Sequence, residues 1–124
     1  MHTSLFALSM SFLMTTNAVA WEGVYNGSWE YGNIRAALLQ RNEYRGQQRF
    51  NVKLSVKRPG CTGEVDGVGY VSGSVMTFRS DETNAPSCLI TLTRSGNKLT
   101  IRTLENCTDY SGASCGFGGI VTRR

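Results

Sequence analysis

The chain has 124 residues, of which 40% are hydrophobic and 18% charged, and its 13 lysines and arginines against nine aspartates and glutamates give a formal net charge of +4. This length accommodates one domain with a core of its own. The single histidine is His2. Its position excludes Ser-His-Asp and Cys-His catalysis from the rest of the chain.

Residues 1–20 are typical of a secretory signal peptide. The segment has no Asp, Glu, Lys or Arg, and residues 5–13 form an apolar run of signal-core length before the small-x-small pattern of Ala18 and Ala20. The run is too short for a membrane span, which takes about 20 apolar residues. An N-terminal helix retained in the fold is the alternative. We expect a cleaved leader and a single domain over residues 21–124, in the periplasm or outside the cell.

Apolar and polar residues alternate repeatedly after the leader, which indicates β-strands. The clearest example covers residues 49–57, where every second side chain is apolar. Residues 33–41 (NIRAALLQR) also suit a helix, but their short length and their neighbours favour a strand. The pattern predicts eight strands, at residues 22–31, 33–41, 48–57, 64–71, 74–80, 88–94, 98–105 and 116–123.

Short turns punctuate these predicted strands. Pro59-Gly60, Ser72-Gly73 and Gly96-Asn97 are turn-forming pairs between alternating segments. Strands joined by hairpins, with no crossover helix between them, predict an antiparallel meander. Closure into an eight-stranded barrel would remove exposed strand edges. The expected fold class is therefore all-β, a single antiparallel eight-stranded barrel with two disulfides.

Four cysteines follow the leader: Cys61, Cys88, Cys107 and Cys115. In an exported domain of this size they predict two disulfides, for which three pairings are possible. Their spacing favours Cys61–Cys88 together with Cys107–Cys115. A zinc site is the alternative, but no C-x-x-C spacing supports it, and we expect no cofactor or metal.

Carboxylates are the remaining residues for enzyme chemistry. Glu64 and Asp66 are expected on one strand face, and residues 81–84 (DETN) lack the spacing of a calcium loop. A carboxylate-based hydrolase is therefore the enzyme alternative. The expected protein is not an enzyme.

Aromatic residues gather in the first predicted strand. Trp21, Tyr25, Trp29 and Tyr31 share one parity, with small glycines between them. Packing across the bottom of a barrel is the favoured interpretation, and the alternative is that they line a ligand site as a stacking platform.

Basic residues lie on the outer faces of two predicted strands. Arg49, Lys53 and Lys57 line one strand, and Lys98 and Arg102 line another. Such a face can bind anionic glycans or headgroups, or simply keep the protein soluble. Because no aromatic residues alternate with these basic ones, we expect no nucleic-acid binding.

The layout of the mature segment is similar to that of small exported proteins of Gram-negative bacteria, through the opening residues 23–27 (GVYNG) and the closing Cys107-(x)7-Cys115-Gly-Phe117-(x)6-Arg124. More loosely, it resembles the periplasmic and membrane-bound inhibitors of c-type lysozyme, which are disulfide-bonded eight-stranded barrels. The Ser-Gly-x-x-Tyr loop of those inhibitors is absent. The resemblance therefore implies the fold, and no inhibitory residue is carried over.

These features together predict a non-enzymatic exported binding protein that does not span a membrane. The favoured function is a protein inhibitor or a virulence factor that contacts a host or envelope partner. Its contact would be the loop between Cys107 and Cys115, with Asp109 and Tyr110 at the tip, because a bridge would pre-organise it.

Two alternatives remain within the class of binding proteins. One is a lipocalin-like carrier of a small apolar or glycan ligand, lined by Trp21, Tyr25 and Trp29. The other is a binder of anionic envelope components through Arg49, Lys53 and Lys57.

Overall fold

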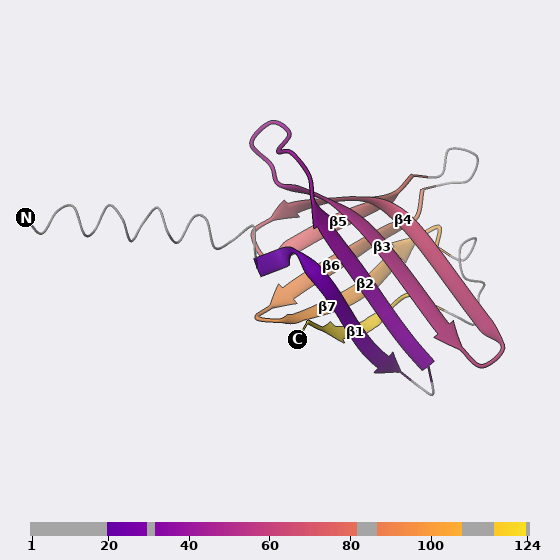
Figure 1. The fold of residues 1–124 in the computed structure, drawn as a ribbon. Helices are drawn as coiled ribbons and strands as arrows, with labels where there is room; N and C mark the ends of the chain where they lie inside the picture. The colour runs from indigo at the N-terminus through magenta and orange to yellow at the C-terminus, as the bar shows by residue number, and fades with distance from the viewer. Residues whose placement is uncertain (1–19, 30–31, 82–86, 108–115, 124) are drawn as a thin grey trace, which may run out of the picture.

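Eight antiparallel strands close into one barrel in the computed structural model, which describes residues 20–29, 32–81, 87–107 and 116–123 (Figure 1). Each strand pairs with its neighbours in the sequence, and β1 pairs with β8 to close the sheet. The predicted fold class is confirmed in its architecture. The strands are β1 (Gly23–Trp29), β2 (Gly32–Gln40), β3 (Arg49–Arg58), β4 (Cys61–Ser72), β5 (Val75–Ser80), β6 (Leu89–Ser95), β7 (Lys98–Glu105) and β8 (Gly119–Thr122). Within the described residues, no helix is long and apolar enough to cross a bilayer.

The segment that suited both a helix and a strand is strand β2. It pairs along its length with β1 on one side and β3 on the other. Ile34, Ala36 and Leu38 are buried in the barrel, while Leu39 is exposed. Two-sided pairing explains the outcome, because its backbone groups find hydrogen-bond partners on both neighbours and the weak helical preference of Ala and Leu is overridden.

Tight turns join three of the strand pairs where glycines allow a positive φ. Gly60, Gly73 and Gly96 have φ angles of 80°, 63° and 60°. The pairs they connect continue to the turn itself, so β4 begins three residues earlier than predicted, directly after Pro59-Gly60. The predicted turns at Pro59-Gly60 and Gly96-Asn97 are confirmed, and the turn predicted at Ser72-Gly73 lies one residue later, because Ser72 still pairs with Val75.

The barrel interior is a packed core. Two inward positions of β4 are glycines. A Cβ at Gly67 would strike the backbone carbonyl of Arg79 and the ring of Phe78, and one at Gly69 would strike Met76. The large side chains of β5 therefore occupy the volume that these glycines leave empty. The largest buried side chains are those of Trp21, Tyr25, Phe50, Phe78, Phe117, Ile34, Leu54, Met76, Ile90, Leu92, Leu99 and Val56.

A disulfide joins Cys88, just before β6, to Cys107, just after β7, with a Cα–Cα distance of 4.6 Å. The predicted pairs Cys61–Cys88 and Cys107–Cys115 are therefore wrong. Spacing along the chain was misleading because β6 and β7 form a hairpin, and a hairpin brings its two outer ends together. Cys61 is partly buried against the core, and Cys115 lies outside the described residues.

The alternation of strand direction gives the barrel two different ends. The Trp21 end holds the start of β1, the end of β8, the 41–48 loop and the two turns at 73–74 and 96–97. The Cys88 end holds the turn at 59–60 and the disulfide. The 41–48 loop between β2 and β3 projects away from the barrel (Figure 1).

Candidate functional site

The predicted ligand-lining residues are part of the core. Trp21 and Tyr25 are 2% and 0% exposed, and the ring of Trp21 packs against Phe50 with centroids 6.5 Å apart. This packing favours the core interpretation over a stacking platform. The side chain of Trp29, like residue Tyr31, lies outside the described part of the chain.

Cations cover the aromatic residues at the Trp21 end. The guanidinium of Arg94 lies 5.6 Å from the ring centroid of Trp21, and that of Arg123 lies 5.5 Å from Tyr25. The Tyr25 hydroxyl donates a hydrogen bond of 2.8 Å to the carbonyl of Trp21. Burial raises the pKa of the Tyr25 phenol, and the nearby positive charges of Arg123 and Arg94 oppose that rise.

Arg123 fastens the last residues of the barrel to the first strand. Its Nη1 donates to the carbonyl of Glu22 and its Nη2 to Oδ1 of Asn97, the latter at 3.2 Å. Its backbone N–H also donates to the carbonyl of Asn97 at 2.8 Å. One arginine thus joins β1, β8 and the 96–97 turn.

The predicted basic stripe on β3 does not form a continuous cationic face. Lys53 lies opposite Asp66 on β4, and its Nζ is 3.4 Å from Oε1 of Glu64. Glu64 and Asp66 share the outer face, as predicted. Lys57 lies four residues further along β3, toward the Cys88 end. Arg102 lies in the middle of β7, a strand that does not pair with β3.

Arg49 belongs instead to a group of aromatic and cationic residues at the 41–48 loop. The guanidiniums of Arg45 and Arg49 each lie 5.2 Å from the ring centroid of Tyr44, which is 49% exposed. Arg49 Nε also donates to the carbonyl of Asn42 at 2.9 Å. Backbone hydrogen bonds between Tyr44 and Gln47 hold the tip of the loop.

Basic residues gather at the Trp21 end of the barrel, and we call this group the cationic end. Among the described residues, this end also holds two carboxylates, those of Glu22 and Glu43. In the rest of the described chain, by contrast, the basic residues are interspersed with Glu64, Asp66, Asp81 and Glu105. The members of the cationic end are Arg41, Arg45, Arg49, Arg94, Lys98 and Arg123.

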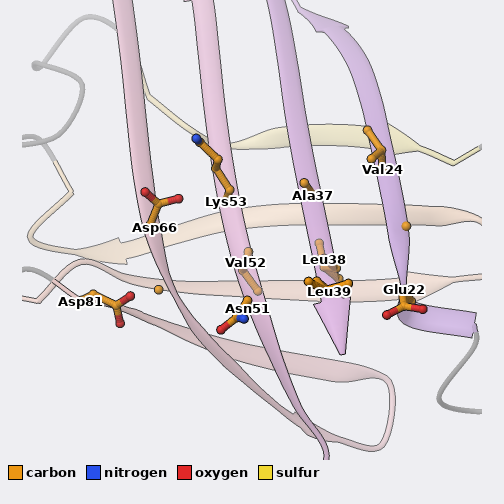
Figure 2. A pocket seen from close by; sticks show the side chains of 12 residues that line it. Glu22, Val24, Ala37, Leu38, Leu39, Asn51, Val52, Lys53, Asp66 and Asp81 are labelled. Carbon is orange, nitrogen blue, oxygen red and sulfur yellow. The ribbon is translucent and has the colours of Figure 1, made fainter. Parts of the chain in front are cut away.

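A shallow groove crosses the outer face of β1 to β4 (Figure 2). Its volume is about 540 Å³, within the range of ligand sites. Val24, Ala37 and Leu39 form an apolar floor, with Val24 41% and Leu39 62% exposed. The register places Val24 directly opposite Ala37. Because the side chain of Ala37 is a single methyl group, the groove is deepest at its centre.

Carboxylates stand at both ends of this groove. Glu22 lies at the β1 side, and Asp66 and Asp81 lie at the β4 side (Figure 2). Glu22 Oε2 accepts the N–H of Gln40 at 2.9 Å, which holds it beside the groove. The N–H of Asp81 donates to the carbonyl of Asp66 at 3.0 Å, which keeps these two residues together.

Sequence reasoning did not find the groove, because its residues come from four strands and meet only through register. One signal in the sequence could have indicated it. Val24 and Leu39 are apolar residues at positions where the alternation along their strands places side chains in solvent. The predicted loop residues Asp109 and Tyr110 lie outside the described part of the chain. No group of three or more potential metal ligands occurs among the described residues.

Comparisons with known proteins identify no relative of this chain. No protein-family model matches the chain, and no curated protein or solved structure is significantly similar to it.

Proposed function

We propose that the chain is a non-enzymatic exported binding protein that docks its cationic end onto an anionic glycan or headgroup surface of a cell envelope. The observation that carries this proposal is the excess of basic side chains at the Trp21 end. Among the described residues, six cations accompany two carboxylates at this end, against six cations and four carboxylates in the rest of the barrel. Such a distribution attracts anionic surfaces and orients the molecule as it approaches them.

The exposed part of the cationic end supports this role. Arg41 and Arg45 on the projecting loop and Lys98, directly after the 96–97 turn, are exposed to solvent. Arginine presents a planar fork of donors to carboxylate and phosphate oxygens. Arg49 is held by Asn42 and Tyr44, so less side-chain entropy is lost when it binds.

The proposal keeps the protein in an oxidising compartment. The disulfide between Cys88 and Cys107 is compatible with export, and residues 1–20 would be the cleaved signal. We further propose a second disulfide, between Cys61 and Cys115. No described cysteine is free, and with Cys88 and Cys107 joined, Cys115 is the partner left for Cys61.

A protein inhibitor acting through Asp109 and Tyr110 remains a prediction from the sequence. Its argument depended on a Cys107–Cys115 bridge closing the loop, and Cys107 is bonded to Cys88 instead. The carrier alternative has no support from the packed interior. Surface docking therefore agrees best with the geometry.

The test compares two triple charge reversals with the same change in net charge. Arg41→Glu, Arg45→Glu and Lys98→Glu alter the cationic end, whereas Arg35→Glu, Lys57→Glu and Arg102→Glu alter exposed sites elsewhere on the wall. Binding of the mature, oxidised protein would be measured on vesicles of phosphatidylglycerol and phosphatidylcholine and on soluble polygalacturonate. The two probes distinguish headgroup phosphate from glycan carboxylate.

We expect the first triple variant to lose roughly 100-fold in affinity or more, from about 1 kcal/mol per basic residue near an anionic surface. The second should lose much less, and added salt should weaken the wild type steeply. Equal losses in both variants would show a response to net charge alone. That result, or no binding to either probe, would reject the proposal.

A further inference from the structure

The groove on the outer face of β1 to β4 is the strongest feature that the proposed function leaves unused. Its occupant cannot be recognised through strand pairing, because β2 and β3 already have neighbours on both sides. Any partner must be held by side chains alone. Two exposed apolar side chains in one depression, Val24 and Leu39, are a surface that association would remove from water.

The charge of the groove is opposite to that of the protein as a whole. Its lining contains three carboxylates, those of Glu22, Asp66 and Asp81, and one ammonium, that of Lys53. The Lys53 ammonium is engaged with Glu64, outside the groove, at 3.4 Å. The groove therefore selects a cation, in a chain whose formal net charge is +4.

The spacing of the carboxylates indicates the shape of that cation. Glu22 flanks β1 and Asp66 lies on β4, three strand positions away. At about 4.8 Å per strand, three positions span roughly 14 Å across the sheet. The register puts Asp66 level with Val24, two residues from Glu22, so the two carboxylates are separated by roughly 16 Å. The apolar floor of Val24, Ala37 and Leu39 covers the β1 and β2 side of the interval, and Asn51 and Lys53 of β3 lie between this floor and Asp66 (Figure 2).

We propose that the groove binds an extended polypeptide segment that presents a basic, an apolar and a second basic side chain on one face. In an extended chain, every second side chain points the same way, and a rise of about 3.3 Å per residue separates the first and fifth residues by roughly 13 Å. A segment of the form Lys-x-Leu-x-Lys therefore places both ammonium groups at the carboxylates and the leucine over Ala37. This site shares Glu22 with the cationic end, but it selects a cation, whereas the cationic end is proposed to bind anions.

The peptide acetyl-Lys-Ser-Leu-Ser-Lys-amide is a direct probe. It would be titrated into the isotope-labelled, oxidised protein while backbone amide shifts are followed by NMR. We expect saturable shifts at Val24, Ala37 and Leu39. A peptide with serine in place of the leucine has the same charge and should bind several-fold more weakly, because it covers no apolar floor.

Matched single variants test the role of the carboxylates. Asp66→Asn should weaken the peptide at least threefold. Glu105→Gln removes the same charge at an exposed site on β7, outside the groove, and should change the binding little. Ala37→Phe should block the site by filling its low centre, and its outward position leaves the core untouched. No saturable shift at the groove, equal binding of the serine peptide, or equal losses in the Asp66 and Glu105 variants would overturn the proposal. None of these outcomes bears on the cationic end, which binds anions.

Discussion

The two ends of the barrel are closed by different means. At the Trp21 end, buried aromatic rings lie under the guanidiniums of Arg94 and Arg123. At the Cys88 end, a disulfide joins the outer ends of β6 and β7, and Ser80 and Cys88 exchange hydrogen bonds of 2.8 and 3.1 Å beside it.

This difference matters for the proposed role. At the Trp21 end, arginines that hold the closure also contribute to the surface charge, so closure and docking share residues. The Cys88 end is fastened covalently and does not depend on that charge. Charge changes at exposed positions such as Arg41 and Lys98 should therefore alter binding without opening the barrel.

The largest effect should come from breaking the aromatic closure. Trp21→Ala removes a fully buried ring from the contact with Phe50 and from beneath Arg94. We expect a loss of about 3–5 kcal/mol in the free energy of unfolding, measured by urea denaturation followed by circular dichroism. A loss below about 1 kcal/mol would show that Trp21 is a cover on the barrel and not part of its core.

Breaking the covalent closure should have the next largest effect. Replacing both Cys88 and Cys107 by alanine removes a disulfide between residues 19 apart in the sequence. The free energy of unfolding should fall by about 3 kcal/mol, mainly because the unfolded chain gains conformational freedom. Urea unfolding of the double variant measures this. Its binding to vesicles should match that of the wild type, because the altered end lies away from the cationic end, and a parallel loss of binding would contradict the separation of the two ends.

Tyr25→Phe should produce a smaller effect with a distinctive pH dependence. The variant loses the hydrogen bond to the Trp21 carbonyl, at a cost of about 1 kcal/mol near neutral pH. Burial raises the pKa of Tyr25 in the folded state above its ordinary value of 10.0, against the opposing charges of Arg123 and Arg94. The folded protein therefore holds the phenol proton more tightly than the unfolded chain does.

The sign of the pH effect follows from that difference. The stability contributed by the neutral phenol is complete below the unfolded pKa and is lost as the pH rises through the higher folded pKa. Urea unfolding between pH 8 and about 11 should show the wild type losing its advantage over Tyr25→Phe at the alkaline end. Parallel curves for the two proteins would show that Tyr25 does not contribute.

We expect the smallest effect on stability from an ion pair on the outer wall of the barrel, between the two ends. Lys53 and Glu64 form an exposed ion pair, with side chains 49% and 56% exposed. A double-mutant cycle with Lys53→Ala and Glu64→Ala should give a coupling energy of about 0.5 kcal/mol or less. A coupling above about 1 kcal/mol would mean that the wall contributes to stability in the same way as the ends.

The architecture could be predicted from the sequence because its signals are local. Alternation along β3 and the glycine turns at 59–60, 73–74 and 96–97 each depend on a few adjacent residues. The boundaries moved by a few positions, most of all for β4, because a strand extends as far as its partner allows. The ambiguity of residues 33–41 was resolved by neighbouring strands, which no local pattern contains.

The candidate sites were predicted less well, for the same physical reason. The sequence favoured a core role for Trp21 and Tyr25 and left a ligand site open, and their burial agrees with the core role. The stripe of Arg49, Lys53 and Lys57 was correct as a strand face. It lost its cationic character because pairing with β4 places Asp66 opposite Lys53 and brings Glu64 to it.

The alternation of side chains and the glycine turns are written in the sequence, and they are enough to predict an antiparallel barrel. Which distant residues meet depends on the folded barrel: Cys88 with Cys107, six of the described cations at one end, and a carboxylate at each side of an apolar groove. Alternation is a property of one strand and survives any register, whereas these groups depend on strand order and register. Both are set by the closure of the whole sheet.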